Sequence, residues 1–296
     1  MALAGVLSAI KDLVLNAPSL PNSKEEREIL YKEKFIKLSE EEIEDLAKIE
    51  PKQLKIYTMT IFNGEKSGLN NHFKMTLALL KRNWEKLEDF PYNEFELVKQ
   101  IYKVRPWKSN KFRDLAEIFK DYLLINKVEY SEQIPELFDV LNFEITIMDT
   151  RRHLNDGGLE AYDSIKLSEL HKMTVMEVMS LKYQVPKYNH FLHFSFDILK
   201  THSDFRKTKE LIKEIPRANQ FAICSRNIKM LTRWTNVSEL LWKHLKSLER
   251  NQSKELAELA DIADELFPDA ENEEILFAEF MEQIAVLVKH GAMILI

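Results

Sequence analysis

The order of elements in the stretch from Gln220 to Ile296 constrains the fold most. Gln220–Cys224 and Ile228–Thr235 are short runs rich in β-branched, aromatic and apolar residues, and they predict two strands joined by a tight turn. Three amphipathic segments follow, each opened by a residue that caps helices well: Ser238, Ser253 and Asn272. Gly291 is suited to end the last helix, and the apolar tail after it fits a final strand.

Strand, strand, helix, helix, helix, strand is the layout of a winged helix-turn-helix domain, so DNA binding is the first function to consider. The charges argue against it, because residues 251–288 contain eleven Asp and Glu and a single Lys. Affinity for nucleic acid comes mostly from Lys and Arg side chains that neutralise phosphates. A winged-helix DNA-binding regulator is therefore the alternative function, and we expect no nucleic-acid partner.

The same layout can bind a peptide. A strand at the edge of a small sheet, beside the third helix, offers unpaired backbone groups to which an extended peptide can add. The alternating pattern of Tyr188–Leu199 predicts one further strand, and the acidic helices would favour a basic peptide. The simpler interpretation is a small acidic module that only packs on the rest of the chain.

The residues from 1 to about 154 have helical periodicity almost throughout. Ser39 and Glu42 have the spacing of a capping box, and we expect Gly64 and Gly68 to separate two helices. Pro51 and Pro135 stand where first helical turns tolerate proline.

Asn155–Gly158 is the clearest break in the chain. The sequence therefore predicts an α+β fold that is mostly α. Residues 1–156 would form a multi-helix domain, and residues 157–296 would form a winged-helix-like domain with preceding strands and a small antiparallel sheet.

Composition limits the chemistry of the chain. A net charge of −6 and a single cysteine, Cys224, fit a cytoplasmic protein without a disulfide framework, and we expect Cys224 to be a buried small apolar residue. Met1–Leu15 fits an amphipathic helix better than a secretory signal, and we expect no membrane partner. The sequence has no nucleotide-binding, zinc-protease or nucleophile-elbow motif and no clustered metal ligands, so no catalytic or metal residue is predicted.

Several segments together resemble a known family. They are Leu54–Tyr57, Phe73–Leu80, Phe112–Phe119, Ile134–Glu144 and Phe221–Asn227. The chain resembles the MbnC-like partner proteins of multinuclear non-haem iron oxidative enzymes, which modify ribosomally made peptides in methanobactin biosynthesis. The resemblance covers most of the chain, through helical patterns and short matches.

The resemblance implies a non-catalytic subunit without a cofactor of its own. It would form a heterodimer with an iron-dependent, MbnB-like enzyme and hold the leader of an MbnA-like precursor peptide on a peptide-recognition element of winged-helix type. The complex would use dioxygen to convert core cysteines to an oxazolone and a thioamide. For the surface that meets the enzyme, the helical half is favoured, and Glu144 is the one candidate residue.

The leader-binding residues are predicted from the geometry of the strand and the third helix, not from a matched motif. The leader would add along Ile228–Thr235, with an apolar wall and acidic side chains supplied by the helix. Trp234 fits core packing equally well. The predicted set is Ile228, Met230, Leu231, Arg233 and Trp234 from the strand, and Glu274, Phe277, Phe280, Met281 and Ile284 from the helix, with Glu282 as a second acidic residue.

Overall fold

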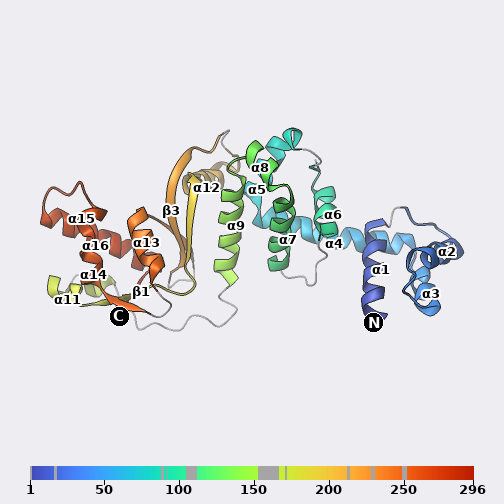
Figure 1. The fold of residues 1–296 in the computed structure, drawn as a ribbon, viewed down its shortest axis with the longest axis horizontal. Coiled ribbons are helices and arrows are strands. Elements are labelled where there is room, and N and C mark those ends of the chain that lie inside the picture. Colours follow the sequence, from blue (N-terminus) through green and yellow to red (C-terminus); the bar gives the residue numbers. More distant parts are fainter. Residues whose placement is uncertain are drawn as a thin grey trace. The chain divides into compact units, whose positions relative to one another are not determined.

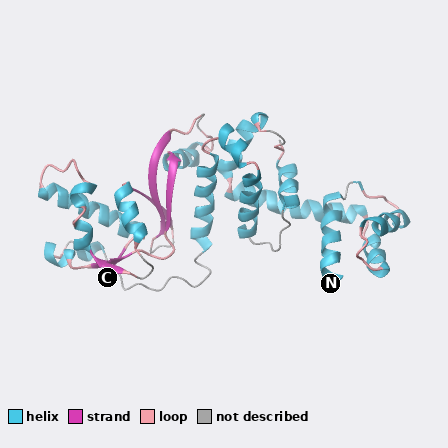
Figure 2. Ribbon diagram, viewed as in Figure 1, coloured by secondary structure: helices cyan, strands magenta, loops and turns pink. Residues whose placement is uncertain are grey.

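The computed structural model describes residues 2–16, 19–87, 90–91, 93–104, 112–152, 167–170, 172–211, 214–227, 231–248 and 252–296. Within them the fold is α+β and mostly α, as the sequence predicts (Figure 2). It contains two small antiparallel sheets of three strands each, whereas the sequence analysis expected one small sheet. The chain divides into two compact units, Met1–Gln133 and Ile134–Ile296. Among the helices of the described residues, none has the length and hydropathy needed to cross a bilayer.

The described part of the first unit is helical. Its elements are α1 (Ala2–Asn16), α2 (Lys24–Lys34), α3 (Glu40–Lys48), α4 (Pro51–His72), α5 (Lys74–Asn83), the 3-10 turn η2 (Trp84–Lys86), α6 (Glu94–Val104), α7 (Phe112–Ile125) and α8 (Lys127–Gln133). The predicted capping box of α3 is confirmed, since the Ser39 hydroxyl accepts from the Glu42 N–H and the Glu42 carboxylate accepts from the Ser39 N–H.

The expected break at Gly64 and Gly68 is wrong, because α4 runs through both glycines and the chain turns at Phe73 instead. A glycine inside a helix costs only about 1 kcal/mol relative to alanine. Phe62 and Leu69 are each about 1% exposed on the same helix, and burial of two such side chains outweighs that cost.

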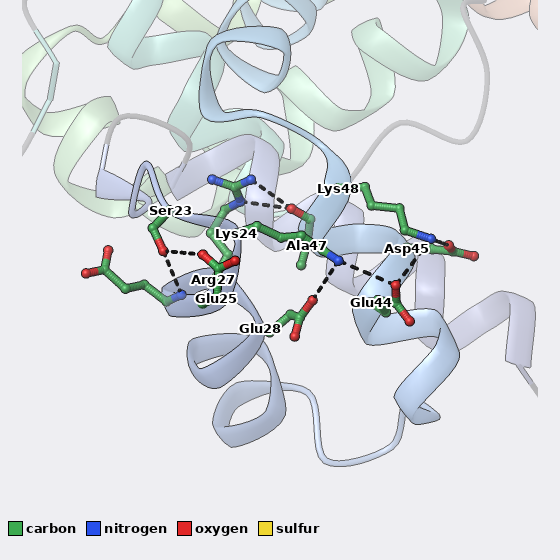
Figure 3. A network of polar contacts seen from close by, with 10 residues as sticks. Ser23, Lys24, Glu25, Arg27, Glu28, Glu44, Asp45, Ala47 and Lys48 are labelled. Carbon is green, nitrogen blue, oxygen red and sulfur yellow. Dashed lines mark hydrogen bonds and ion pairs between the residues drawn. The ribbon is translucent and has the colours of Figure 1, made fainter.

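A buried arginine joins α2 to the end of α3 and to the segment that precedes α2. The Arg27 guanidinium is 3% exposed and donates twice to the carbonyl of Ala47, at 3.1 and 2.8 Å, near the end of α3 (Figure 3). It also donates to the carbonyls of Pro21 and Asn22, at 3.0 and 2.6 Å. The planar fork of arginine suits this geometry, and the exposed ion pairs around it are individually weak.

The second unit carries all the strands found among the described residues. Its elements are α9 (Leu137–Arg152), α10 (Leu167–Leu170), α11 (Val175–Met179), β1 (Lys182–Gln184), β2 (His190–Phe196), α12 (Ile198–Thr208), β3 (Arg217–Arg226), β4 (Thr232–Val237), α13 (Glu239–Ser247), β5 (Ser253–Glu255), α14 (Leu256–Ala260), α15 (Ala263–Leu266), α16 (Glu273–His290) and β6 (Ile294–Leu295). The larger sheet has the order β2-β3-β4 and the smaller one β5-β1-β6.

Helices cover both faces of the larger sheet, and Figure 1 shows β3 between α9 and α13. On one face, the ring of Phe143 from α9 stacks on Trp234 with centroids 4.7 Å apart, and the Thr150 hydroxyl lies 3.3 Å from the Cys224 sulfur. On the other face, Phe221 packs edge-on against Trp242 of α13. β3 is therefore the central, buried strand of this unit.

The C-terminal elements differ from the predicted series in two ways. The predicted helix after Ser253 is instead strand β5 followed by the short helices α14 and α15, because Ser253–Glu255 pairs with β1. The terminal strand β6 also pairs with β1, not with the β3–β4 hairpin. The caps of α16 are confirmed, with the Asn272 side chain accepting from the Ile275 N–H and Gly291 at a φ of 78°.

The division between the units lies after Gln133, whereas the sequence analysis placed it after Asp156. The reason is α9, which contacts all three strands of the larger sheet and so belongs with them. The break at Asn155–Gly158 lies outside the described residues.

Candidate peptide-binding edge strand

The turn between β3 and β4 fixes which backbone groups of β4 are already paired. The Asn227 N–H donates to the carbonyl of Leu231 at 3.1 Å, and the Leu231 N–H donates to the Asn227 side chain at 3.1 Å. The register continues from this pair without a bulge. Because bonded and non-bonded positions alternate in an antiparallel pair, the residues of β4 that bond to β3 are Arg233, Thr235 and Val237.

The other residues of β4 direct their backbone groups away from β3. These are Thr232, Trp234 and Asn236, each with one N–H and one C=O in the plane of the sheet. In the part of the chain that the structure describes, no strand pairs with β4 on that side. Three outward-facing residues at alternate positions form an edge to which an extended segment can hydrogen-bond.

The opposite edge of the sheet, β2, is partly closed by a side chain. The carboxylate of Asp139, in the first turn of α9, accepts from the backbone N–H of Ser195 at 2.6 Å. Burial raises the pKa of Asp139, and hydrogen bonds from the Ser195 and Phe196 backbone oppose that rise. The register between β2 and β3 shifts at Ser195, and because Asp139 takes up the Ser195 N–H, that group is not available to an added strand.

The predicted residues of the strand have different surroundings. Leu231 is 48% exposed and Arg233 is also exposed, so both are available to a ligand. Trp234 is half-buried against Phe143, which supports the core-packing interpretation of its ring. Ile228 and Met230 lie outside the described residues.

The predicted helical wall is not an exposed surface. Phe280 and Ile284 are 2% and 1% exposed and belong to the core of the second unit. Phe277 and Met281 are partly buried, and Glu274 is exposed in the first turn of α16. The third helix is apolar on more than one side, and the sequence does not tell which side the core covers.

The C-terminal end of α16 is the part that meets the hairpin. The Thr235 hydroxyl lies 2.9 Å from the His290 Nδ1, and the Ser225 hydroxyl donates to the His290 carbonyl at 2.9 Å. Glu274 stands sixteen residues before His290, which is about 24 Å along the helix axis. The acidic first turn of α16 is therefore far from the point where the helix contacts β4.

The titratable side chains near β4 at the C-terminal end of α16 are basic. Burial lowers the pKa of His290, and the neighbouring cations Arg233 and Lys289 lower it further. Sequence reasoning missed Lys289 and His290 because its count of charged residues covered 251–288 and stopped before the last two residues of α16. Their position in the last turn, where cations complement the helix dipole, was the available signal.

Two further predicted residues are buried. Glu144 of α9 is 6% exposed, so its side chain is not part of the accessible surface of the chain. Cys224 is a buried residue as predicted, and burial raises the pKa of its thiol to about 12. Within the described residues there is no cluster of three or more potential metal ligands.

No protein-family model matches this chain, and no curated protein is significantly similar to it. The geometry of the second unit is therefore the basis for a functional assignment.

Proposed function

We propose that this chain is the non-catalytic, peptide-presenting subunit of an iron- and dioxygen-dependent enzyme complex, and that it holds a leader peptide by strand addition to β4. The observation that carries the proposal is the open edge of β4, with the backbone groups of Thr232, Trp234 and Asn236 facing outward. The chain would act in the cytoplasm as a heterodimer with an MbnB-like iron enzyme. The substrate would be an MbnA-like precursor peptide.

Two features support a peptide-presenting subunit over an enzyme that acts without a partner. The resemblance to MbnC-like partner proteins includes Phe221–Asn227, which forms the part of β3 next to β4 and the turn between them. The order of β3, β4, α13 and α16 is also compatible with a winged-helix-like peptide-recognition element. The iron would reside in the partner enzyme, and the modified cysteines would belong to the precursor.

The register gives the leader a defined path. Its backbone would bond to Thr232, Trp234 and Asn236, and its side chains would alternate between the α9 side and the α16 side of the sheet. On the α16 side, Arg233 and Lys289 would favour an acidic leader residue. Basic leader residues would be placed toward Glu282, which is exposed farther from the C-terminal end of α16.

The sharpest test removes one outward N–H and leaves the hairpin intact. Asn236→Pro deletes an N–H that does not bond to β3, and proline is tolerated at such edge positions. We expect about tenfold weaker binding of a labelled synthetic leader, since one hydrogen bond is lost and the ring obstructs the edge. Asn236→Ala is the matched control and should bind normally, because it keeps the N–H.

Leader affinity that is unchanged in a folded Asn236→Pro variant would refute strand addition at β4. Co-expression with the neighbouring gene product tests the partner separately. A stable one-to-one complex that contains iron supports the proposal, and failure to pair with any iron protein contradicts it.

A further inference from the structure

The first unit contains an apolar pocket that the proposed function does not use. The pocket lies between α1, α4 and α6 and has a volume of about 330 Å³. α1 contributes Val14 and Leu15, and α6 contributes Phe95. Its size is in the range of small-molecule sites, which are mostly apolar and carry a few polar groups that fix orientation.

Two of the side chains that line the pocket are held in place by packing and by hydrogen bonds. Phe62 lines the pocket, is 1% exposed and contacts Phe95 edge-on, with ring centroids 5.3 Å apart. The Thr58 hydroxyl donates to the Leu54 carbonyl at 2.7 Å and lies 3.1 Å from the carbonyl of Val14, in the last turn of α1. Contact with this carbonyl in the last turn of α1 ties α1 to α4 beside the pocket.

Both charged side chains among the described residues that line the pocket are cationic. Lys55 of α4 and Lys99 of α6 both line it, and none of the eight described lining residues is acidic. Lys99 is 3.7 Å from the exposed carboxylate of Glu96 on its own helix, an ion pair of the weak (i, i+3) kind. The aliphatic part of a lysine side chain can cover apolar surface while its ammonium group stays in water. An apolar ligand with an anionic end would therefore match both the apolar lining and the two ammonium groups.

We infer that this pocket binds a medium-chain carboxylate, with the alkyl chain on Phe62 and Met59 and the carboxylate between Lys55 and Lys99. The volume accommodates roughly ten methylene groups, each about the size of a water molecule. Met59 is 46% exposed and lines the pocket, so a bound chain would cover part of an apolar side chain that water now contacts. Charge complementarity selects an acid over an alcohol of the same length.

The test is calorimetric titration of the full chain with decanoate and with decanol, below the concentrations at which they aggregate. We expect one decanoate per chain and about tenfold weaker binding of decanol. Lys55→Gln combined with Lys99→Gln should reduce decanoate binding to the level of decanol and leave decanol unchanged. Lys52→Gln is the matched control, because Lys52 is exposed on α4 and does not line the pocket.

Met59→Trp should abolish binding of both compounds by filling the pocket, in a protein whose circular dichroism is unchanged. Equal affinities for acid and alcohol would overturn the assignment of the lysines. Lack of saturable binding, or an equal loss in Lys52→Gln, would overturn the site. None of these readouts depends on leader binding.

Discussion

Substitution of Gly291 by alanine should destabilise the second unit, and the structure allows the size of the effect to be worked out. Gly291 ends α16 with a φ of 78°, in the left-handed region, where an alanine costs about 1–2 kcal/mol. A Cβ at this position would overlap the carbonyl oxygen of Arg226 and lie 2.6 Å from its carbonyl carbon. Either the end of β3 or the end of α16 must therefore shift.

The shift would disturb the hydrogen bonds that close the helix. The Gly291 N–H donates to the Val288 carbonyl at 3.0 Å, and the Ala292 N–H donates to the Leu287 carbonyl at 2.8 Å. Loss of both would cost about 2 kcal/mol at about 1 kcal/mol each. Together with the backbone strain, Gly291→Ala should lower the free energy of unfolding of this unit by about 3–4 kcal/mol.

Gly64→Ala is the matched control with the opposite sign. Gly64 lies inside α4, and a Cβ added there meets no atom within 4 Å. Alanine is favoured over glycine in a helix interior, so this change should stabilise the first unit by about 0.5–1 kcal/mol.

The assay is hydrogen exchange measured by mass spectrometry as urea is raised, because it reports the two units separately. Peptides from α16 and β3 should open at lower urea in Gly291→Ala, and peptides from α4 should open at higher urea in Gly64→Ala. A Gly291→Ala protein with unchanged protection of α16 would refute the reasoning from the left-handed cap and the Arg226 contact.

Three other predictions address buried or paired groups. Arg27→Lys should lower stability by about 2–3 kcal/mol in urea denaturation, because lysine cannot reproduce four guanidinium hydrogen bonds. Burial would raise the pKa of Glu94, but hydrogen bonds from Lys81, Asn70 and Lys66 outweigh it and lower the pKa to about 2. The stability that the ionised Glu94 contributes should thus be present above about pH 4.5 and lost between pH 4.5 and 2. The difference in urea midpoint between wild type and Glu94→Gln should therefore shrink as the pH falls from 5 to 2.5. A difference that stays constant over this range would contradict the prediction. Cys224 should react with iodoacetamide at pH 8 only in denaturant, and rapid labelling of the native protein would show that its burial is wrong.

Local signals in the sequence predicted local structure well. Ser39, Asn272 and Gly291 each take the capping role that their residue types indicate, since a cap depends on side chains within one turn. Ser253 has the same signal but begins β5, because pairing with β1, a segment from much earlier in the chain, overrides the local preference.

The candidate site was predictable only in part, for the same reason. A run of β-branched residues near a turn indicates a strand, and β4 is found at the edge of its sheet. Which backbone groups face outward depends on the register, which the bond between Asn227 and Leu231 fixes. The sequence could not indicate that Phe280 and Ile284 face the core, because α16 has apolar residues on more than one side.

The contact between Asp139 and Ser195 has a consequence for how the sheet can grow. Among the described residues β4 has no further partner strand, whereas at β2 the Ser195 N–H is already bonded to Asp139, so an additional strand meets fewer obstacles at β4 than at β2. Self-association through β4 would pair the same edge of two molecules and close as a two-fold dimer. The asymmetry of the two edges thus disfavours open-ended growth of the sheet from molecule to molecule.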